Sequence, residues 1–277
     1  MASIALSAGT IDYDDTGGDG PVVVPIHGVM QSGTVWREVV ADLRADHRCI
    51  VPTLPLGAHR QPMHDDADLS LRGLALLIAE LLERLDLHDV TLVANDWGGP
   101  QVTVVERPER IGRLVLAATE AFDNIPPGLP GKTARLAGRA PGGLLVAAWS
   151  LRIPFMRRSP LTFGWMTKRG IPSDMFGGWI RPLRTERQVR RDLAKYGRAK
   201  DYGLLAEAAD GLRSFDRPAL IVWGTEDRVM PIDHARRLAK LFPDVRLVEL
   251  DDTYTLIPID QPHELATAIR EHIQGSL

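Results

Sequence analysis

The stretch VANDWGG, Val93 to Gly99, decides how this chain folds. The apolar run at 90–95 is typical of a buried strand, and the pattern that follows predicts a helix from about Gly98. Between them Asp96 occupies a sharp turn, and the positions two before and two after it, Ala94 and Gly98, are both small. A strand, a small residue two before and two after a central Asp, and a helix form the nucleophile-elbow pattern, with Asp in the usual place of Ser. The stretch therefore predicts a reactive carboxylate at the end of a strand; the alternative is that Asp96 only caps the helix.

Outside this stretch, strand-like and helix-like segments alternate along the chain. Continuous apolar runs predict strands at 21–26, 48–54, 90–95, 113–119, 219–224 and 245–250. Helical spacing predicts helices at 34–43, from Ser70, from about Gly98, at 234–242 and from about Pro262. Apolar strands separated by helices indicate an α/β fold, with a mostly parallel central sheet flanked by helices. In such a sheet the ligand site lies outside the carboxyl ends of the strands, where Asp96 stands.

Residues 125–212 interrupt this alternation and are rich in Pro, Gly, Arg and Trp. We predict that they form a helical cap inserted into a core made of residues 1–124 and 213–277. The segment carries 16 Lys and Arg against 6 Asp and Glu, so its charge of +10 leaves −13 for the rest of a chain whose net charge is −3. A basic segment in an acidic body can attract an anionic small-molecule substrate. The alternative is an ordinary solvated helical surface.

The composition, 44% hydrophobic and 25% charged over 277 residues, is that of a soluble globular protein. Cys49 is the single cysteine, so no internal disulfide can form. The first 15 residues lack the basic segment of a signal peptide, and no run of 18 apolar residues occurs, which favours a cytoplasmic location without a membrane partner. Because the sequence holds no metal-ligand cluster, phosphate loop or dinucleotide fingerprint, we expect no cofactor, no metal ion and no nucleic-acid partner.

Four motifs together resemble the α/β-hydrolase superfamily, and within it the haloalkane dehalogenases and epoxide hydrolases. They are IHG (26–28), NDWGG (95–99), WGTEDRVMP (223–231) and IDQPHELA (259–266), and the resemblance covers nearly the whole chain. It implies the α/β-hydrolase fold, a mobile helical cap and Asp96 as a covalent nucleophile. It also implies that the backbone N–H groups of Val29 and Trp97 form an oxyanion hole, and that the Trp97 indole binds a leaving group.

Two residues are candidates for the acid that supports the reaction. Asp227 follows the strand ALIVWG (219–224) in the Gly-x-x-Asp arrangement that the superfamily uses, whereas Glu120 ends the preceding strand at the position of the acid in some dehalogenases. We favour Asp227 on the context of the motif. Its surroundings are also those of an ordinary turn, so a purely structural role stays open.

The catalytic His expected from the resemblance is missing. The family places it seven residues before the Pro of "QP", and that position is Thr255; no His occurs between His234 and His263. An ester formed on Asp96 would then lack the base that activates water and should persist. His59, in a loop on the expected active-site side, is a candidate substitute base. Tyr254 and Thr255 are candidate substitutes as well, chiefly as hydrogen-bond donors, because a neutral phenol is a poor base.

Further departures limit what the resemblance implies about the substrate. The residue after His27-Gly28 is Val29, where the dehalogenases carry an Asn that binds halide. Met30 stands where epoxide hydrolases often have Pro, and the cap tyrosines Tyr196 and Tyr202 match no motif. Three hypotheses follow: a covalent Asp96 enzyme acting on an alkyl electrophile with an atypical or absent base, a non-hydrolytic enzyme of the same fold (a lyase, an isomerase or a cofactor-free oxygenase), and a catalytically silent ligand-binding protein.

Overall fold

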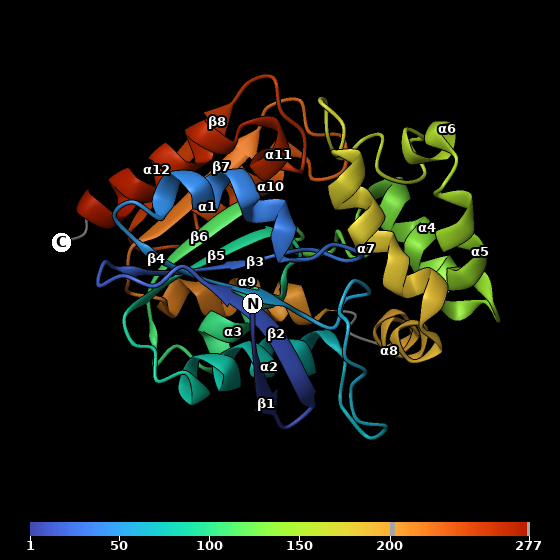
Figure 1. The fold of residues 1–277 in the computed structure, drawn as a ribbon. Coiled ribbons are helices and arrows are strands. Elements are labelled where there is room, and N and C mark those ends of the chain that lie inside the picture. Colours follow the sequence, from blue (N-terminus) through green and yellow to red (C-terminus); the bar gives the residue numbers. More distant parts are fainter. Residues whose placement is uncertain (200–202, 276–277) are drawn as a thin grey trace.

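A computed structural model describes residues 1–199 and 203–275. In this part of the chain one eight-stranded sheet has the order β1-β2-β4-β3-β5-β6-β7-β8 (Figure 1). The strands are β1 (Ala2–Leu6), β2 (Gly9–Asp15), β3 (Val22–Ile26), β4 (Arg48–Thr53), β5 (Val90–Asp96), β6 (Ile111–Thr119), β7 (Ala219–Gly224) and β8 (Val245–Leu250). Strands β4 to β8, with β3, pair in parallel, which confirms the predicted α/β-hydrolase fold.

The first two strands were not predicted from the sequence. β1 and β2 pair antiparallel, and β2 also pairs antiparallel with β4. Their residues do not form a continuous apolar run, because this edge of the sheet is largely exposed and Ile11 is the most deeply buried side chain of β2. Pairing with β4 through the backbone, rather than an apolar pattern, holds these strands in the sheet.

Helices cover both faces of the sheet (Figure 1). On one face lie α2 (Leu71–Arg84), α3 (Gly99–Glu106) and α9 (Leu204–Gly211), and α3 packs against both of the others. On the other face, α1 (Arg37–Leu43) packs against α12 (Pro262–Gly275). The shorter η1 (Gly33–Trp36), η2 (Leu212–Ser214), α10 (Ile232–Ala239) and α11 (Ile257–Asp260) complete the core. All seven residues of β5 are buried between these layers, so Asp96 ends a fully enclosed strand.

Five helices between β6 and β7 form a separate group at one end of the molecule (Figure 1). They are α4 (Gly128–Arg139), α5 (Gly143–Ser150), α6 (Pro154–Arg157), α7 (Ser173–Thr185) and α8 (Arg187–Arg198). We call residues 125–199 the helical insertion. The boundary predicted at residue 212 also includes α9, but α9 packs against α3 and so continues the helical layer of the core.

Candidate active site

The turn after β5 holds Asp96 in a conformation that side chains rarely adopt. Its φ is +68°, in the left-handed region, and the Asp96 carbonyl accepts a hydrogen bond from the Glu120 N–H (2.9 Å). A Cβ added to Gly28 would lie 1.8 Å from Asp96 Oδ2, so only glycine permits this approach. A strained, over-determined residue at the end of a strand is typical of a functional site. The sharp turn predicted around Asp96 is therefore confirmed in its geometry.

The Asp96 carboxylate receives two hydrogen bonds from the loop after β3. Gln31 donates from Nε2 to Asp96 Oδ2 (2.9 Å), and the Val29 N–H also donates to this carboxylate. The sequence analysis did not identify Gln31. The only signal available was a polar residue in the loop that follows the His27-Gly28 turn. These bonds hold one face of the carboxylate, as a positioned nucleophile requires.

Trp97 does not have the contacts expected of it. Its backbone N–H donates to the carbonyl of Asn95 (2.8 Å), so of the two N–H groups expected to form an oxyanion hole only that of Val29 contacts Asp96. Its indole Nε1 donates to the hydroxyl of Tyr196 in α8 (3.1 Å). The indole is thus engaged by the helical insertion and is not free to meet a leaving group unless α8 moves. Tyr202 lies outside the described residues.

Asp227 lies at the position where the family's acid would orient a His. Its Oδ1 accepts hydrogen bonds from Thr255 Oγ1 (2.9 Å) and from the N–H groups of Val229 (2.8 Å) and Met230 (2.9 Å). Its Oδ2 is buried and has no hydrogen-bond partner within the described residues. Asp227 and Thr255 are therefore in direct contact, and Asp227 Oδ2 is left with room in its hydrogen bonding for a further donor.

Asn95 ties the turn to the loop that carries Thr255. Its side-chain amide donates to the carbonyl oxygens of Thr255 and Ala117, both at 2.7 Å. Asn95 and Thr255 are 160 residues apart in the sequence. These hydrogen bonds place Thr255 beside the turn that carries Asp96.

Glu120 also belongs to this site. It is buried, lines the cavity in front of Asp96, and accepts a hydrogen bond from the Gly98 N–H through Oε2 (3.3 Å). Its backbone carbonyl is held by Gln101 Nε2 (2.6 Å). The structure thus brings both candidate acids to the site, Asp227 on the side of Thr255 and Glu120 on the side of the cavity.

Burial raises the pKa of all three carboxyl groups. It raises the pKa of Asp96 to about 7, with the charge of Asp227 as a second cause. Burial raises the pKa of Asp227 to about 7 as well, against the hydrogen bonds from Met230, Val229 and Thr255. The pKa of Glu120 rises to about 8 through burial and then through the charge of Asp96. Because three buried like charges repel each other, some of these groups are protonated at neutral pH.

We expect the pKa of Asp96 to set the pH dependence of any attack by this residue. Only the ionised carboxylate is a nucleophile, and below its pKa the ionised fraction falls about tenfold for each pH unit. The rate at which an alkyl halide such as 1-bromohexane labels Asp96 should therefore rise with pH and level off above about pH 7. Labelling rates measured from pH 5 to pH 9 check this. A rate that is already constant from pH 5 to pH 9 would show that the pKa of Asp96 is not raised.

The proposed substitutes for the missing base do not meet at the site. His59 is buried, with Nε2 3.3 Å from Asp192 Oδ2 in α8 and Nδ1 accepting from the Gly57 N–H (3.4 Å). Both of its ring nitrogens are engaged, and it is not among the residues that line the cavity. The Tyr254 ring lies between the cations of Lys168 and Arg228, at 5.3 Å from each, and does not line the cavity either. The structure therefore does not support His59 or Tyr254 as a replacement for the missing base.

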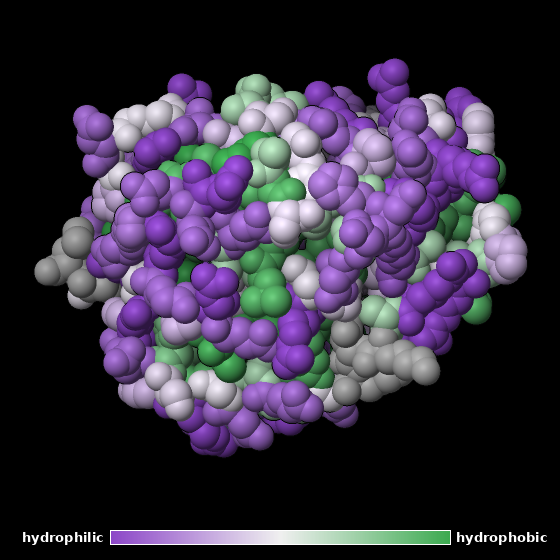
Figure 2. Space-filling view, turned by 90° about the horizontal axis from the view of Figure 1, so that it is seen from below, coloured by the Kyte–Doolittle hydropathy of each residue, from purple (hydrophilic) through white to green (hydrophobic). Residues whose placement is uncertain are grey.

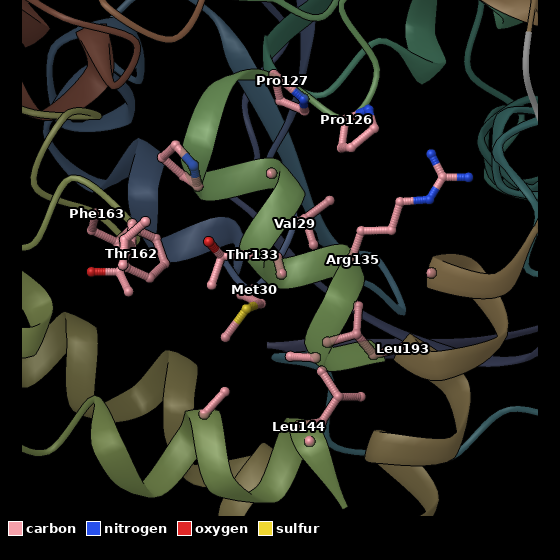
Figure 3. Close-up of a pocket in the computed structure, with 18 of the residues that line it drawn as sticks. Val29, Met30, Pro126, Pro127, Thr133, Arg135, Leu144, Thr162, Phe163 and Leu193 are labelled. Carbon is pink, nitrogen blue, oxygen red and sulfur yellow. The ribbon is translucent and has the colours of Figure 1, made fainter. Parts of the chain in front are cut away.

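A cavity of about 460 Å³ lies between the core and the helical insertion. Figure 3 shows Val29 and Met30 of the core, with Leu144, Phe163 and Leu193 of the insertion, around this space. Asp96, Trp97 and Glu120 form its polar end, and most other lining side chains are apolar. A cavity of this size and polarity is suited to a small organic ligand.

Among the described residues that line the cavity, Arg135 of α4 is the single Lys or Arg side chain. It donates to the Ala199 carbonyl (3.4 Å), and its charge lowers the pKa of Glu120. In Figure 3 the Arg135 side chain extends away from Thr162 and Phe163. Most of the positive charge of the insertion therefore lies outside the cavity. Within residues 1–199 and 203–275 no group of His, Cys, Asp and Glu is arranged to hold a metal ion.

Comparison with known proteins identifies the class of this chain. The sequence profile of the family described as "alpha/beta hydrolase fold" matches residues 21–262, so the chain belongs to the α/β-hydrolase fold family. It is 28% identical over 288 residues to the protein of Xanthomonas campestris named cis-3-alkyl-4-alkyloxetan-2-one decarboxylase, covering 95% of this chain and 92% of that one.

Other relatives are haloalkane dehalogenases. The chain is 28% identical over 282 residues to haloalkane dehalogenase 2 of Mycobacterium tuberculosis, covering 96% of this chain and 92% of the relative. A crystal structure of a putative ancestral haloalkane dehalogenase superposes with a TM-score of 0.79 at 20% identity, covering 99% of both chains. The family and these relatives identify the chain as an enzyme of this fold, related to haloalkane dehalogenases and to the oxetanone decarboxylase.

Proposed function

We propose that this enzyme uses Asp96 as a covalent nucleophile on an apolar alkyl electrophile bound in the cavity. The observation that carries the proposal is the position of the Asp96 carboxylate, which is buried at a strained turn and faces an apolar space. Gln31 holds Oδ2, which leaves Oδ1 to attack a carbon atom from the cavity side. The helical insertion acts as the cap that excludes water during this attack.

Completion of the reaction by hydrolysis has no evident base. Hydrolysis needs a group that takes a proton from water next to the ester, and position 255 supplies a hydroxyl that already bonds to Asp227. Asp227 has a carboxylate oxygen without a partner within the described residues, but Asp227 does not line the cavity in which water would attack. An ester formed from a simple haloalkane should therefore accumulate on Asp96.

Incubation with 1-bromohexane, followed by intact-protein mass spectrometry, tests this proposal. We expect the mass to rise by one hexyl group per chain, and bromide release to stop after about one equivalent. Continued bromide release would show that a base is present after all. If no adduct forms with bromo- or iodoalkanes at pH 8, Asp96 is not a nucleophile.

A second candidate function, a decarboxylating lyase, requires no base at all. In a four-membered cyclic ester, Asp96 would attack the saturated ring carbon that is bonded to the ring oxygen. The bond between this carbon and the ring oxygen would break, which leaves a free carboxylate on the opened substrate. Loss of CO2 then moves its electron pair into a new C=C bond and expels the Asp96 carboxylate unchanged. Neither water nor a proton is consumed, so the absence of an imidazole at position 255 does not block the cycle. The relative named as an oxetan-2-one decarboxylase supports this candidate.

In this second reaction Glu120 is the group placed to act as an acid. It lines the cavity, and burial holds its pKa at about 8, so at neutral pH it carries a proton that it can share with the ring oxygen as the C–O bond breaks. Asp227, which does not line the cavity, would instead support the loop of Thr255.

A cis-3,4-dialkyl-oxetan-2-one distinguishes the two functions. We expect many equivalents of alkene and CO2 per chain from this compound, while 1-bromohexane gives one adduct and then stops. Formation of the hydroxy acid would show that water opens the ring and would contradict the lyase. No product at all, with the bromohexane adduct still formed, would leave covalent alkylation without decarboxylation.

A further inference from the structure

The outer surface of the helical insertion carries most of the exposed apolar side chains of this protein. Of the nine large apolar side chains that are exposed in the described residues, seven lie within residues 129–161. We call these seven the apolar face: Leu129, Leu136, Val146, Trp149, Ile153, Phe155 and Leu161. Phe155 is 77% exposed and Val146 is 70% exposed. A concentration of this kind on a single segment marks an interaction surface.

The same segment is purely cationic. Residues 129–161 include Lys132, Arg135, Arg139, Arg152, Arg157 and Arg158 but no Asp or Glu. Lys132, Arg152 and Arg158 are exposed, and within the described residues none of these three forms an ion pair. The Arg152 guanidinium lies 5.3 Å from the centre of the Trp149 ring, so a cation and an aromatic side chain stand together on this surface.

The cavity reaches the surface beside two residues of the apolar face. Helix α4 packs against α5, and α4, α5 and α6 lie together at one end of the molecule (Figure 1). Figure 2 shows hydrophobic residues at this same end, on the right-hand edge, next to hydrophilic ones. Val146 and Leu161 are exposed and also line the cavity, so the cavity reaches the surface within the apolar face.

We propose that the apolar face docks onto an anionic phospholipid bilayer. Aromatic and aliphatic side chains on short helices, with Lys and Arg among them, are the combination that lies in the plane of a membrane interface. The phosphate groups of the lipids supply the negative charge that residues 129–161 lack, and the long Arg side chains can reach them while the apolar groups enter the acyl layer. The chain outside residues 125–212, with a charge of −13, is repelled by the same surface and orients the insertion toward it.

A second copy of the chain fits the apolar face less well. Two such faces in contact would bring twelve cations together without a carboxylate from residues 129–161 between them, which opposes association. Docking differs from insertion, because no helix within the described residues is long and apolar enough to cross a membrane. The expectation of no membrane partner rested on the absence of such a segment, which does not bear on binding at the membrane surface.

Docking would deliver apolar molecules from the bilayer to Asp96 through the opening beside Val146 and Leu161. This consequence rests on the proposed function, whereas docking itself does not. Experiment can separate the two proposals. Vesicle binding without an Asp96 adduct would support the docking surface and contradict the proposed function. An Asp96 adduct without vesicle binding would support the proposed function and contradict the docking surface.

Co-sedimentation of the full chain with vesicles tests the docking surface. The probes are vesicles of phosphatidylcholine alone and vesicles that also contain 30 mol% phosphatidylglycerol. We expect binding to the anionic vesicles at low salt, and a steep loss of binding as salt rises. Lys132→Gln with Arg158→Gln should weaken binding about twenty-five-fold, since each cation near the surface is worth about fivefold in affinity.

A second pair of variants tests the apolar part. Ile153→Ser with Phe155→Ser should lower the partition coefficient at least about tenfold, because two apolar side chains no longer enter the bilayer. Leu76→Ser is the matched control, because Leu76 is exposed on α2 of the core, outside the apolar face, and this variant should bind like the unmodified protein. Three results would overturn the proposal: no binding to anionic vesicles, equal loss with Leu76→Ser, or a dimer in solution that Phe155→Ser dissociates.

Discussion

Asp96→Asn abolishes covalent labelling by 1-bromohexane. The amide differs from the carboxylate by one atom and keeps the shape of the buried side chain, but its oxygen carries no charge with which to displace bromide. By comparison with the loss of a nucleophile in other enzymes, we expect the labelling rate to fall about 10⁴-fold or more. Intact-protein mass spectrometry measures the adduct, and peptide mapping places it in the segment that contains Asp96.

Asp227→Asn is the matched control for this variant. Asp227 is buried with a raised pKa, as Asp96 is, but it does not line the cavity. The Asp227→Asn protein should therefore still be labelled at Asp96. Labelling should be faster near pH 6, because removal of the Asp227 charge lowers the pKa of Asp96. An adduct that still forms in the Asp96→Asn protein and maps to Glu120 would show that Glu120, and not Asp96, is the nucleophile.

Thr255→His should convert the single labelling event into turnover. Asp227 already contacts residue 255 through Oδ1, and its unpartnered Oδ2 can accept the N–H of an imidazole placed there. The other ring nitrogen can then take a proton from water that attacks the ester on Asp96. Repeated bromide release, measured over hours with excess 1-bromohexane, is the expected result.

Two controls make this result interpretable. Thr255→Val keeps the size of the side chain and removes only its hydroxyl, so it should leave a persistent adduct. Adding Asp227→Asn to Thr255→His should reduce turnover strongly, because the ring loses the carboxylate that orients it. Position 255 is fully buried, and the larger ring costs about 1–3 kcal/mol through overpacking. Thermal unfolding must therefore show a folded variant; a folded Thr255→His protein that forms the adduct without turnover would contradict the assignment of position 255.

The reaction class follows from what happens to the ester rather than from how it forms. Formation of the proposed ester needs an oriented carboxylate beside an apolar cavity, and Gln31 holds Asp96 at such a cavity. Hydrolysis also needs a base and a water molecule, whereas decarboxylative elimination needs only a substrate that carries its own leaving CO2. If Asp96 forms the proposed ester, the threonine at position 255 leaves elimination open and offers hydrolysis no imidazole base.

The sequence by itself was sufficient for the elbow, the parallel sheet and the absence of a His at position 255. Elbow and strands depend on contiguous residues: a fully buried parallel strand must be apolar throughout, and a sharp turn must be flanked by small side chains. Ala94 and Gly98 around Asp96 therefore carry the prediction without knowledge of distant contacts. The sequence did not predict the hairpin of β1 and β2, because strands held by backbone pairing with β4 need little apolar pattern.

Only the tertiary structure decided which side chains meet. Gln31 bonds to Asp96 across 65 residues, Trp97 donates to Tyr196 of the insertion, and His59 turns to Asp192 rather than to the cavity. None of these pairs has a fixed spacing, because each joins segments whose separation depends on how the sheet, the loops and the insertion pack together. The unpartnered oxygen of Asp227 belongs with them: the sequence places a threonine at position 255, and only packing shows that Asp227 Oδ2 has no hydrogen-bond partner within the described residues.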